Sequence, residues 1–208
     1  MSTNPTGYGV STVREICVAD SRHPEIRRLR RLGYQPSLHG TKVWRSCYAM
    51  MEYLEQNPID MGAQVMDVGC GWGVLSAYFA VRFKAQVLAV DADADLEYFV
   101  ALHAEMNDVE LDFVAARFQQ LRRADFTGID LLVGTDICFW EELTQPILLM
   151  IGRAIDAGVP RIVIGDPGRQ PFWQLSQKCA KRFGAQTITQ KTLHPVRTEK
   201  QLLIIEGR

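Results

Sequence analysis

The 208-residue sequence lacks an apolar run long enough to span a bilayer, and its first residues contain no hydrophobic segment of the kind that directs secretion. Both absences favour a cytoplasmic protein without a membrane partner. The five cysteines show no paired spacing typical of a zinc site, and their odd number does not suit a disulfide framework. We therefore expect reduced, mostly buried thiols and no bound metal.

A strong net charge is also missing. A chain with a net charge of -1 and a pI of about 6.4 has no broad basic field, so we expect no DNA binding, and RNA binding only through a local patch. One candidate patch is the short helix predicted from Pro24 to Leu32, which carries Arg27, Arg28, Arg30 and Arg31. These arginines form either a docking surface for an acidic protein or a phosphate backbone, or an ordinary solvated helix face.

The sequence does contain enough apolar side chains, 47% of its residues, to build one α/β domain with a large core. We assign residues 41–208 to this domain. Residues 1–40 are expected to form an N-terminal extension, which starts with a tail from Met1 to about Val10 and includes the short basic helix.

A cluster of glycines in residues 65–76 organises the rest of the chain. Apolar residues lead into the segment Asp67-Val-Gly69-Cys-Gly71-Trp-Gly73, after which a helix can form. The order of strand, tight turn and helix is typical of a nucleotide-binding turn, because glycines let the backbone pass close to a ligand and the helix N-terminus faces that ligand.

A second acid supports this interpretation. The next predicted strand, Val87 to Val90, ends at Asp91, about 20 residues after the glycines, where a carboxylate can accept hydrogen bonds from both hydroxyls of a ribose. A nicotinamide-binding turn would need the pattern GxGxxG, with its third glycine at the position of Val74. The sequence has GxGxG instead and contains no Tyr-x-x-x-Lys pair, so a dehydrogenase is the weaker interpretation.

The GxGxG spacing, with an acid two residues before the first glycine, resembles motif I of the seven-stranded S-adenosylmethionine-dependent methyltransferases. The resemblance implies S-adenosylmethionine as cofactor, with Asp67 facing the methionyl ammonium and Asp91 facing the ribose. It also implies a Rossmann-like, doubly wound, seven-stranded sheet in a three-layer α/β/α arrangement with an antiparallel last strand. The predicted strands from Gln186 to Lys191 and from Gln201 to Glu206 fit the final hairpin of that fold.

The same resemblance extends the cofactor site beyond the glycine turn. A helix predicted from Thr41 to Gln56 resembles the helix that precedes motif I in methyltransferase family 16, whose tryptophan lies near the cofactor pocket. Arg117 or Phe118, which follow the third strand, are expected to cover the adenine ring. The cofactor-binding candidates are Trp44, Asp67, Gly69, Gly71, Trp72, Gly73, Asp91, Ala92, Arg117 and Thr135.

The fourth predicted strand carries an acid to its carboxyl end. The segment Asp136-Ile-Cys-Phe139 resembles the Asp-x-x-Tyr motif of family 16, many of whose members modify protein lysines or histidines, but phenylalanine replaces the tyrosine. Any role for a phenolic hydroxyl is therefore lost. The resemblance implies that Asp136 binds and orients an acceptor amine, and that Phe139 and Trp140 form an aromatic wall beside it.

The segment Gly-Asp166-Pro-Gly-Arg169 follows the fifth strand and is either a simple tight turn or part of a site. It resembles the lysine methyltransferases that act on the β-subunit of electron-transfer flavoprotein, which makes Asp166 and Arg169 candidate substrate-side residues. We expect methyl transfer to a lysine of a protein substrate. The alternatives are a small-molecule or RNA acceptor and, because the tyrosine is missing, a non-catalytic protein that binds S-adenosylmethionine.

Overall fold

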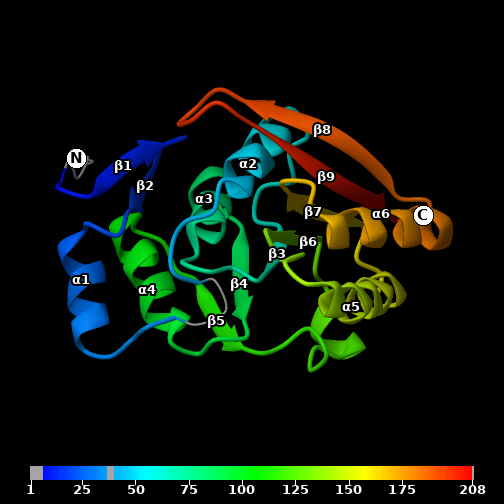
Figure 1. The fold of residues 1–208 in the computed structure, drawn as a ribbon, viewed down its shortest axis with the longest axis horizontal. Helices are drawn as coiled ribbons and strands as arrows, with labels where there is room; N and C mark the ends of the chain where they lie inside the picture. The colour runs from blue at the N-terminus through cyan, green and yellow to red at the C-terminus, as the bar shows by residue number, and fades with distance from the viewer. Residues whose placement is uncertain (1–6, 37–39, 208) are drawn as a thin grey trace.

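A seven-stranded sheet forms the centre of the computed structural model, which describes residues 7–36 and 40–207. The strands lie in the order β5-β4-β3-β6-β7-β9-β8, and within this sheet β9 alone runs in the direction opposite to the other strands. This topology confirms the predicted sheet and its final hairpin (Figure 1). The strands are β3 (Gln64–Val68), β4 (Gln86–Asp91), β5 (Asp112–Ala115), β6 (Leu131–Thr135), β7 (Arg161–Asp166), β8 (Gln186–Thr192) and β9 (Thr198–Glu206).

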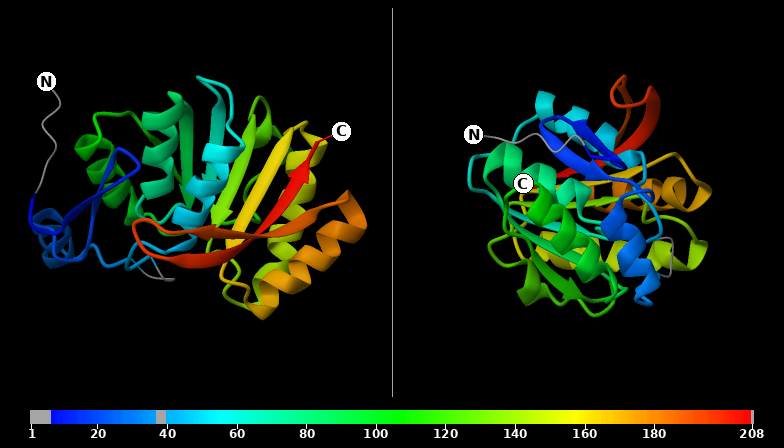
Figure 2. Two further views of the ribbon diagram at one scale, coloured as in Figure 1. Left: turned by 90° about the horizontal axis from the view of Figure 1, so that it is seen from above. Right: turned by 90° about the vertical axis from the view of Figure 1, so that its left-hand side faces the viewer.

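Helices cover both faces of the sheet and complete the three layers (Figures 1 and 2). Neighbouring residues of a strand point to opposite faces. On β3, Val65 therefore packs into one core with α2 and α3, whereas Met66 packs into a second core with α5 and α6. The helices are α2 (Ser46–Gln56), α3 (Val74–Phe83), α4 (Leu96–Met106), α5 (Thr144–Asp156) and α6 (Gln170–Phe183).

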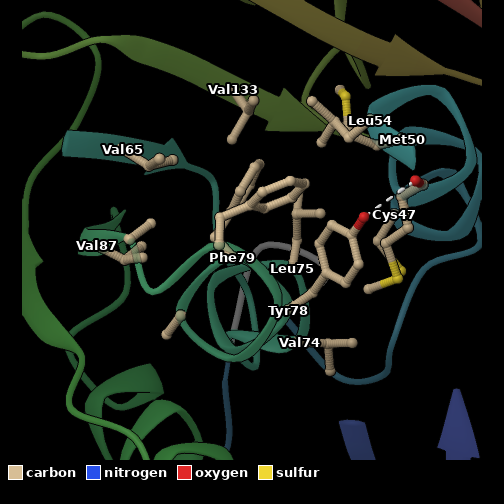
Figure 3. Close-up of a cluster of buried hydrophobic side chains, with 14 of the residues drawn as sticks. Cys47, Met50, Leu54, Val65, Val74, Leu75, Tyr78, Phe79, Val87 and Val133 are labelled. Atoms are coloured by element: carbon tan, nitrogen blue, oxygen red, sulfur yellow. Dashed lines mark hydrogen bonds between the residues drawn. The ribbon is translucent and has the colours of Figure 1, made fainter. Parts of the chain in front are cut away.

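The first of these cores fixes the helix that follows the glycine turn (Figure 3). Tyr78 and Phe79 of α3 are fully buried, between the sheet and α2. The Tyr78 hydroxyl lies 3.3 Å from the carbonyl oxygen of Met51 in α2, so the polar end of this ring is satisfied inside the core. Burial of two large aromatic rings holds α3 in place, and with it the turn at its N-terminus.

The N-terminal residues form a hairpin that the sequence did not reveal, with strands β1 (Val10–Val13) and β2 (Ile16–Ala19). Ile16 is fully buried in the same core as α3, and α1 (Pro24–Arg31) buries Ile26 and Leu29 beside α4. Of the tail predicted up to Val10, residues 1–6 lie outside the described residues and Val10 begins β1. The boundary between residues 40 and 41 stays a prediction.

Hydrogen bonds from α4 hold this hairpin. The side-chain amide of Asn107 pairs with the backbone of Cys17, accepting from its N–H at 2.6 Å and donating to its carbonyl at 2.9 Å. His103 accepts from the N–H of Ala19 through Nε2 and lies 2.9 Å from the carbonyl of Phe99 through Nδ1. Burial lowers the pKa of His103 to about 4, so the ring is neutral with its proton on Nδ1. The role of His103 is structural.

One helix begins later than the sequence predicted. The helix expected from Thr41 begins at Ser46, because the carbonyls of Gly40 and Thr41 accept hydrogen bonds from the side chains of Trp72 and Arg30. After β6, the 3-10 turn η2 (Glu141–Leu143) leads directly into α5. Pro146 therefore lies in the first turn of α5, where its missing N–H costs little and no kink is needed.

Within the described residues, no helix combines the length and the apolar character needed to cross a membrane.

Replacement of Ile16 by alanine tests whether the hairpin belongs to the cooperative unit. The free energy of unfolding should fall by about 2 to 5 kcal/mol, because the change leaves a cavity in the core shared with α3. Urea unfolding of the whole chain measures this loss. Thr12→Ala, an exposed position on the same hairpin, should change stability by less than about 0.5 kcal/mol. An Ile16→Ala protein as stable as the parent would show that the hairpin does not fold with the sheet.

Candidate active site

A cleft of about 300 Å³ lies at the carboxyl ends of β3, β4 and β6. Its wall is formed by the turn after β3, the ends of β4 and β6, the segment after β5 and the segment before α2. β3 and β6 are neighbours in the sheet but not in sequence, so the chain leaves them in opposite directions and a crevice opens between their ends. The position is that of a ligand site in a doubly wound sheet.

The glycine turn shapes the floor of this cleft. Gly69 and Gly71 both have positive φ, 69° and 55°. A Cβ on Gly69 would lie 2.4 Å from Cγ2 of Ile137, so no side chain fits there. A Cβ on Gly71 would meet no atom within 4 Å, and Gly71 lines the cleft. The turn therefore keeps open the space that a ligand resting on its backbone would fill.

Asp91 stands at the end of β4 with its carboxylate on the cleft wall. Oδ2 accepts the N–H of Gly71 at 3.1 Å and Oδ1 accepts the N–H of Asp93 at 3.2 Å. Burial raises the pKa of Asp91, and the backbone hydrogen bonds oppose this rise. Each carboxylate oxygen has a further acceptor position, so the group can also accept hydroxyl hydrogens from a ligand.

Asp67 does not line the cleft. Its side chain is 1% exposed and accepts the hydroxyl hydrogen of Ser76 in α3 at 2.7 Å. Burial raises the pKa of Asp67 to about 7; the Ser76 hydrogen bond opposes this shift and the nearby charge of Asp91 adds to it. Contact of Asp67 with a methionyl ammonium stays a prediction.

Trp72 and Gly73 also lie outside the cleft lining, although both were predicted to bind the cofactor. Trp72 is buried against Phe99 of α4, with ring centroids 5.4 Å apart. Its indole N–H donates to the carbonyl of Gly40 at 2.7 Å, and Gly40 does line the cleft. Trp72 therefore holds Gly40 at the cleft wall without lining the cleft itself.

Aromatic rings form the opposite wall, where Trp44, Phe139 and Trp140 line the cleft. Trp44 meets Phe139 edge-on, with centroids 5.1 Å apart, and Phe139 lies 5.9 Å from Trp140. Cations of the chain already lie over these rings: Lys42 Nζ is 4.2 Å from the Trp44 centroid, and the Arg169 guanidinium is 4.1 Å from the Phe139 centroid. The Trp44 and Phe139 rings of this wall therefore already have cation–π contacts with the chain's own cations.

Asp136 lies beside this wall and is held from several sides. It adopts a φ of 55°, and its N–H donates to the carbonyl of Gly165 at 2.8 Å. One carboxylate oxygen accepts from the N–H of Ser46, the first residue of α2, at 3.2 Å. The other accepts from Nη1 of Arg169 at 3.1 Å. Both oxygens of the predicted acceptor-binding group already have a partner within the chain.

The same guanidinium nitrogen of Arg169 also donates to Oδ2 of Asp166 at 2.6 Å. The Asp166 side chain is fully buried, and Oδ1 accepts the N–H groups of Gly168 and Arg169. Burial raises the pKa of Asp166, against the hydrogen bonds and charge of Arg169. Asp166 and Arg169 do not line the cleft; they lie behind Asp136 and support it.

The cleft brings together most of the residues that the sequence suggested, but not all of them. The predicted residues that line it are Trp44, Gly69, Gly71, Asp91, Ala92, Arg117, Phe118, Thr135, Asp136, Phe139 and Trp140, and those that do not are Asp67, Trp72, Gly73, Asp166 and Arg169. Sequence reasoning missed the lining residues Gly40, Ala116, Gln119, Ile137 and Leu143. Among the described residues, no group of three or more His, Cys, Asp or Glu side chains is placed to hold a metal ion.

The sheet order, the glycine turn and the acid at the end of β4 define an α/β domain with a nucleotide-type cofactor cleft. The profile of a family described as a methyltransferase domain matches residues 65–154. The electron transfer flavoprotein beta subunit lysine methyltransferase of Xenopus laevis is 30% identical over 131 residues, which are 62% of this chain and 52% of that protein. The chain spans about half the length of such relatives.

Solved structures share the fold at low sequence identity. The crystal structure of TrmN from Thermus thermophilus has a TM-score of 0.62 and 16% identity, covering 88% of this chain and 53% of that one. The structure of M. capricolum TrmK in complex with S-adenosyl-homocysteine has a TM-score of 0.55 and 11% identity, covering 76% of this chain and 68% of that one. Together, the sheet topology and the glycine turn give the Rossmann-like fold shared with these solved methyltransferases, and residues 65–154 match a methyltransferase domain family.

Asp67 should make the stability of the ligand-free protein depend on pH. Its folded pKa of about 7 lies above the ordinary value of 3.8, so the folded state holds a proton that the unfolded state releases. This contribution to stability is lost as the pH rises through 7. From about pH 6 to about pH 8 the loss should be about 1.4 kcal/mol. Urea unfolding of the parent and of Asp67→Asn, which keeps an acceptor for Ser76, should give curves that diverge as the pH rises; parallel curves would contradict the assignment.

Removal of the Arg169 side chain should destabilise the fold. Arg169→Met leaves Asp136 and Asp166 buried without their cation, which should cost about 3 kcal/mol of unfolding free energy. The double variant Arg169→Met/Asp166→Asn should recover part of this loss, because one unpaired charge is gone. Lys181→Met, an exposed change on α6, the helix that follows Arg169, serves as control and should have little effect. Equal stabilities for the single and double variants would mean that the Asp166 pair is not coupled to Arg169.

Proposed function

We propose that the protein transfers a methyl group from S-adenosylmethionine to the side chain of a lysine in a protein substrate. The observation that carries this proposal is one cleft with two unlike walls. The Asp91 carboxylate and the glycine turn form one wall, and the aromatic rings of Trp44, Phe139 and Trp140 form the other. The similarity to lysine methyltransferases, over about half their length, supports a protein acceptor.

On the cofactor side, the residues present fit a nucleoside. Asp91 offers acceptor positions for ribose hydroxyls, and the open space at Gly71 leaves room for a ligand against the turn. Arg117 and Phe118, after β5, line the same cleft at the place expected for an adenine ring. When bound, S-adenosylmethionine supplies an electrophilic methyl group on a sulfonium; the similar fold of a protein solved with S-adenosyl-homocysteine supports this choice.

On the acceptor side, the chain must hold an amine in its neutral form, because only a free lone pair can attack. A lysine with its ordinary pKa of about 10.4 is almost wholly charged near neutral pH, and burial among apolar rings lowers this pKa. A free carboxylate would oppose that effect by stabilising the ammonium. Here the Arg169 guanidinium offsets the charge of Asp136, so this carboxylate orients the amine with a weaker hold on its proton. The proton leaves to water.

An assay of methyl transfer tests the proposal. We expect radiolabelled methyl groups from S-adenosylmethionine to enter the protein fraction of a cell lysate in a protease-sensitive band, and the mass of a labelled peptide then identifies a lysine. Asp91→Ala is the control. Because each charge-assisted hydrogen bond to the ribose is worth about 1.5 to 3 kcal/mol, cofactor affinity measured by calorimetry should fall at least tenfold and the label should disappear.

Other outcomes separate the alternatives. Label confined to the RNA or small-molecule fraction would replace the lysine acceptor and keep the methyltransferase. Tight binding of S-adenosylmethionine with no label in any fraction would favour a non-catalytic binding protein. Unchanged cofactor affinity in Asp91→Ala would contradict the assignment of the cleft itself.

A further inference from the structure

A second hollow in the surface lies outside the cleft, beside α1. It has a volume of about 490 Å³ and is lined by Tyr8, Arg22, Pro24, Arg27, Arg30 and Arg31. α1 turns Ile26 and Leu29 into the protein, so its arginines face outward, and Arg22, Arg27 and Arg31 are exposed. Tyr8 is 66% exposed, and the guanidiniums of Arg22 and Arg27 each lie 5.8 Å from its ring centroid. We call this hollow the α1 surface.

The α1 surface has more positive charge than its own acids can neutralise. Arg22 pairs with Asp20, and Arg28 pairs with Glu25. Arg27 and Arg31 form no ion pair with any described residue, and Arg30 donates to a backbone carbonyl. An anionic partner can therefore gain charge-assisted hydrogen bonds here without displacing existing pairs.

The α1 surface and the cleft are joined by a short stretch of backbone. Arg30 lines the α1 surface, and its Nη2 donates to the carbonyl of Thr41 at 2.8 Å. The preceding residue, Gly40, lines the cleft, and the next, Lys42, lies over the Trp44 ring of the aromatic wall. A chain bound at the α1 surface can thus continue past Thr41 toward the acceptor wall.

We infer that the α1 surface binds an acidic segment of the substrate protein, next to the part that presents the acceptor in the cleft. This inference rests on the proposed function. An acidic protein segment fits better than RNA because the chain as a whole has a net charge of -1, and the positive charge is confined to one short helix and its flank. Phosphate backbones are usually held by wider basic faces with many contacts. The Arg22–Asp20 pair, in which Nε and Nη2 both donate to the carboxylate, shows the contact that such a segment would repeat.

Binding of an oligoglutamate peptide tests the inference without reliance on methyl transfer. A fluorescein-labelled oligoglutamate should bind the full chain at low ionic strength, as measured by anisotropy, and an oligoglutamine of equal length should not. Arg27→Glu/Arg31→Glu should weaken binding by at least about tenfold, because two attractive charges become repulsive. Binding should also weaken as salt is added. Both positions are exposed and neither contributes to the buried face of α1, so the fold should survive.

The matched control is Lys178→Glu/Lys181→Glu. It makes the same change in charge at exposed positions of α6, at the opposite end of the molecule from α1 (Figure 1). This variant should bind the peptide like the parent. An equal loss of peptide affinity in both variants would mean that the effect comes from the change in net charge, and this would overturn the inference. Preferential binding of a single-stranded RNA oligonucleotide, lost in Arg27→Glu/Arg31→Glu, would overturn it in favour of RNA.

The lysate assay links the α1 surface to catalysis. With the parent protein labelling a protein band, Arg27→Glu/Arg31→Glu should label that band much more weakly while its affinity for S-adenosylhomocysteine stays unchanged. Undiminished labelling would overturn the inference and leave the proposed function standing. If the parent protein labels no protein, the proposed function is wrong, and so is the substrate role of the α1 surface. The peptide titration tests binding of an acidic segment independently of this result.

Discussion

The hydrogen bonds of the Arg169 guanidinium connect several elements of the site. Nη1 reaches Asp136 after β6 and Asp166 at the end of β7, while Arg169 itself immediately precedes α6. Asp136 in turn accepts from the first N–H of α2 at Ser46. One cation thus ties two strand ends to two helix starts. If one partner is removed, a buried charge is left without its counterion. These contacts are therefore strongly interdependent.

The part of the cleft around the glycine turn is held mainly by backbone conformation and backbone hydrogen bonds. Its shape comes from backbone: positive φ in the glycine turn, and N–H groups of Gly71 and Asp93 that hold the Asp91 carboxylate in place. Asp67 lies beneath, where burial favours its neutral form near pH 7. The two halves therefore differ in their tolerance of change. At the glycine turn, the limit is steric, because Gly69 has no room for a side chain. Around Asp136, the limit is the balance of buried charge.

Features with a local signal could be predicted from the sequence. The bounds of α6 have such a signal, because Pro171 suits the first turn and Gly184 takes the left-handed conformation that ends the helix. Strand ends such as Asp91 and Thr135 were predictable because parallel strands end at one edge of a sheet. The positions of Ser46 and Gly40 at the site were not predictable. They depend on the path that the segment before α2 takes past the carboxyl ends of the strands.

The hairpin β1–β2 escaped prediction for a related reason. Its turn uses Arg14 and Glu15 at positive φ, without the glycine or asparagine that normally marks such a turn. Packing on α3, hydrogen bonds from His103 and Asn107, and an ion pair between Arg14 and Glu52 of α2 stabilise it. The hairpin is therefore stabilised by tertiary contacts and has no local sequence pattern from which it could be predicted.

Asp136 is also non-glycine at positive φ, which costs about 1 kcal/mol or more. The backbone bond to Gly165 and the contacts with Ser46 and Arg169 offset this cost. These contacts also fix the orientation of the carboxylate before any ligand binds. The Arg169 guanidinium partly neutralises its negative charge. A carboxylate held in this way needs little rearrangement when a ligand binds beside it, and such preorganisation is what makes a buried charge effective in a binding site.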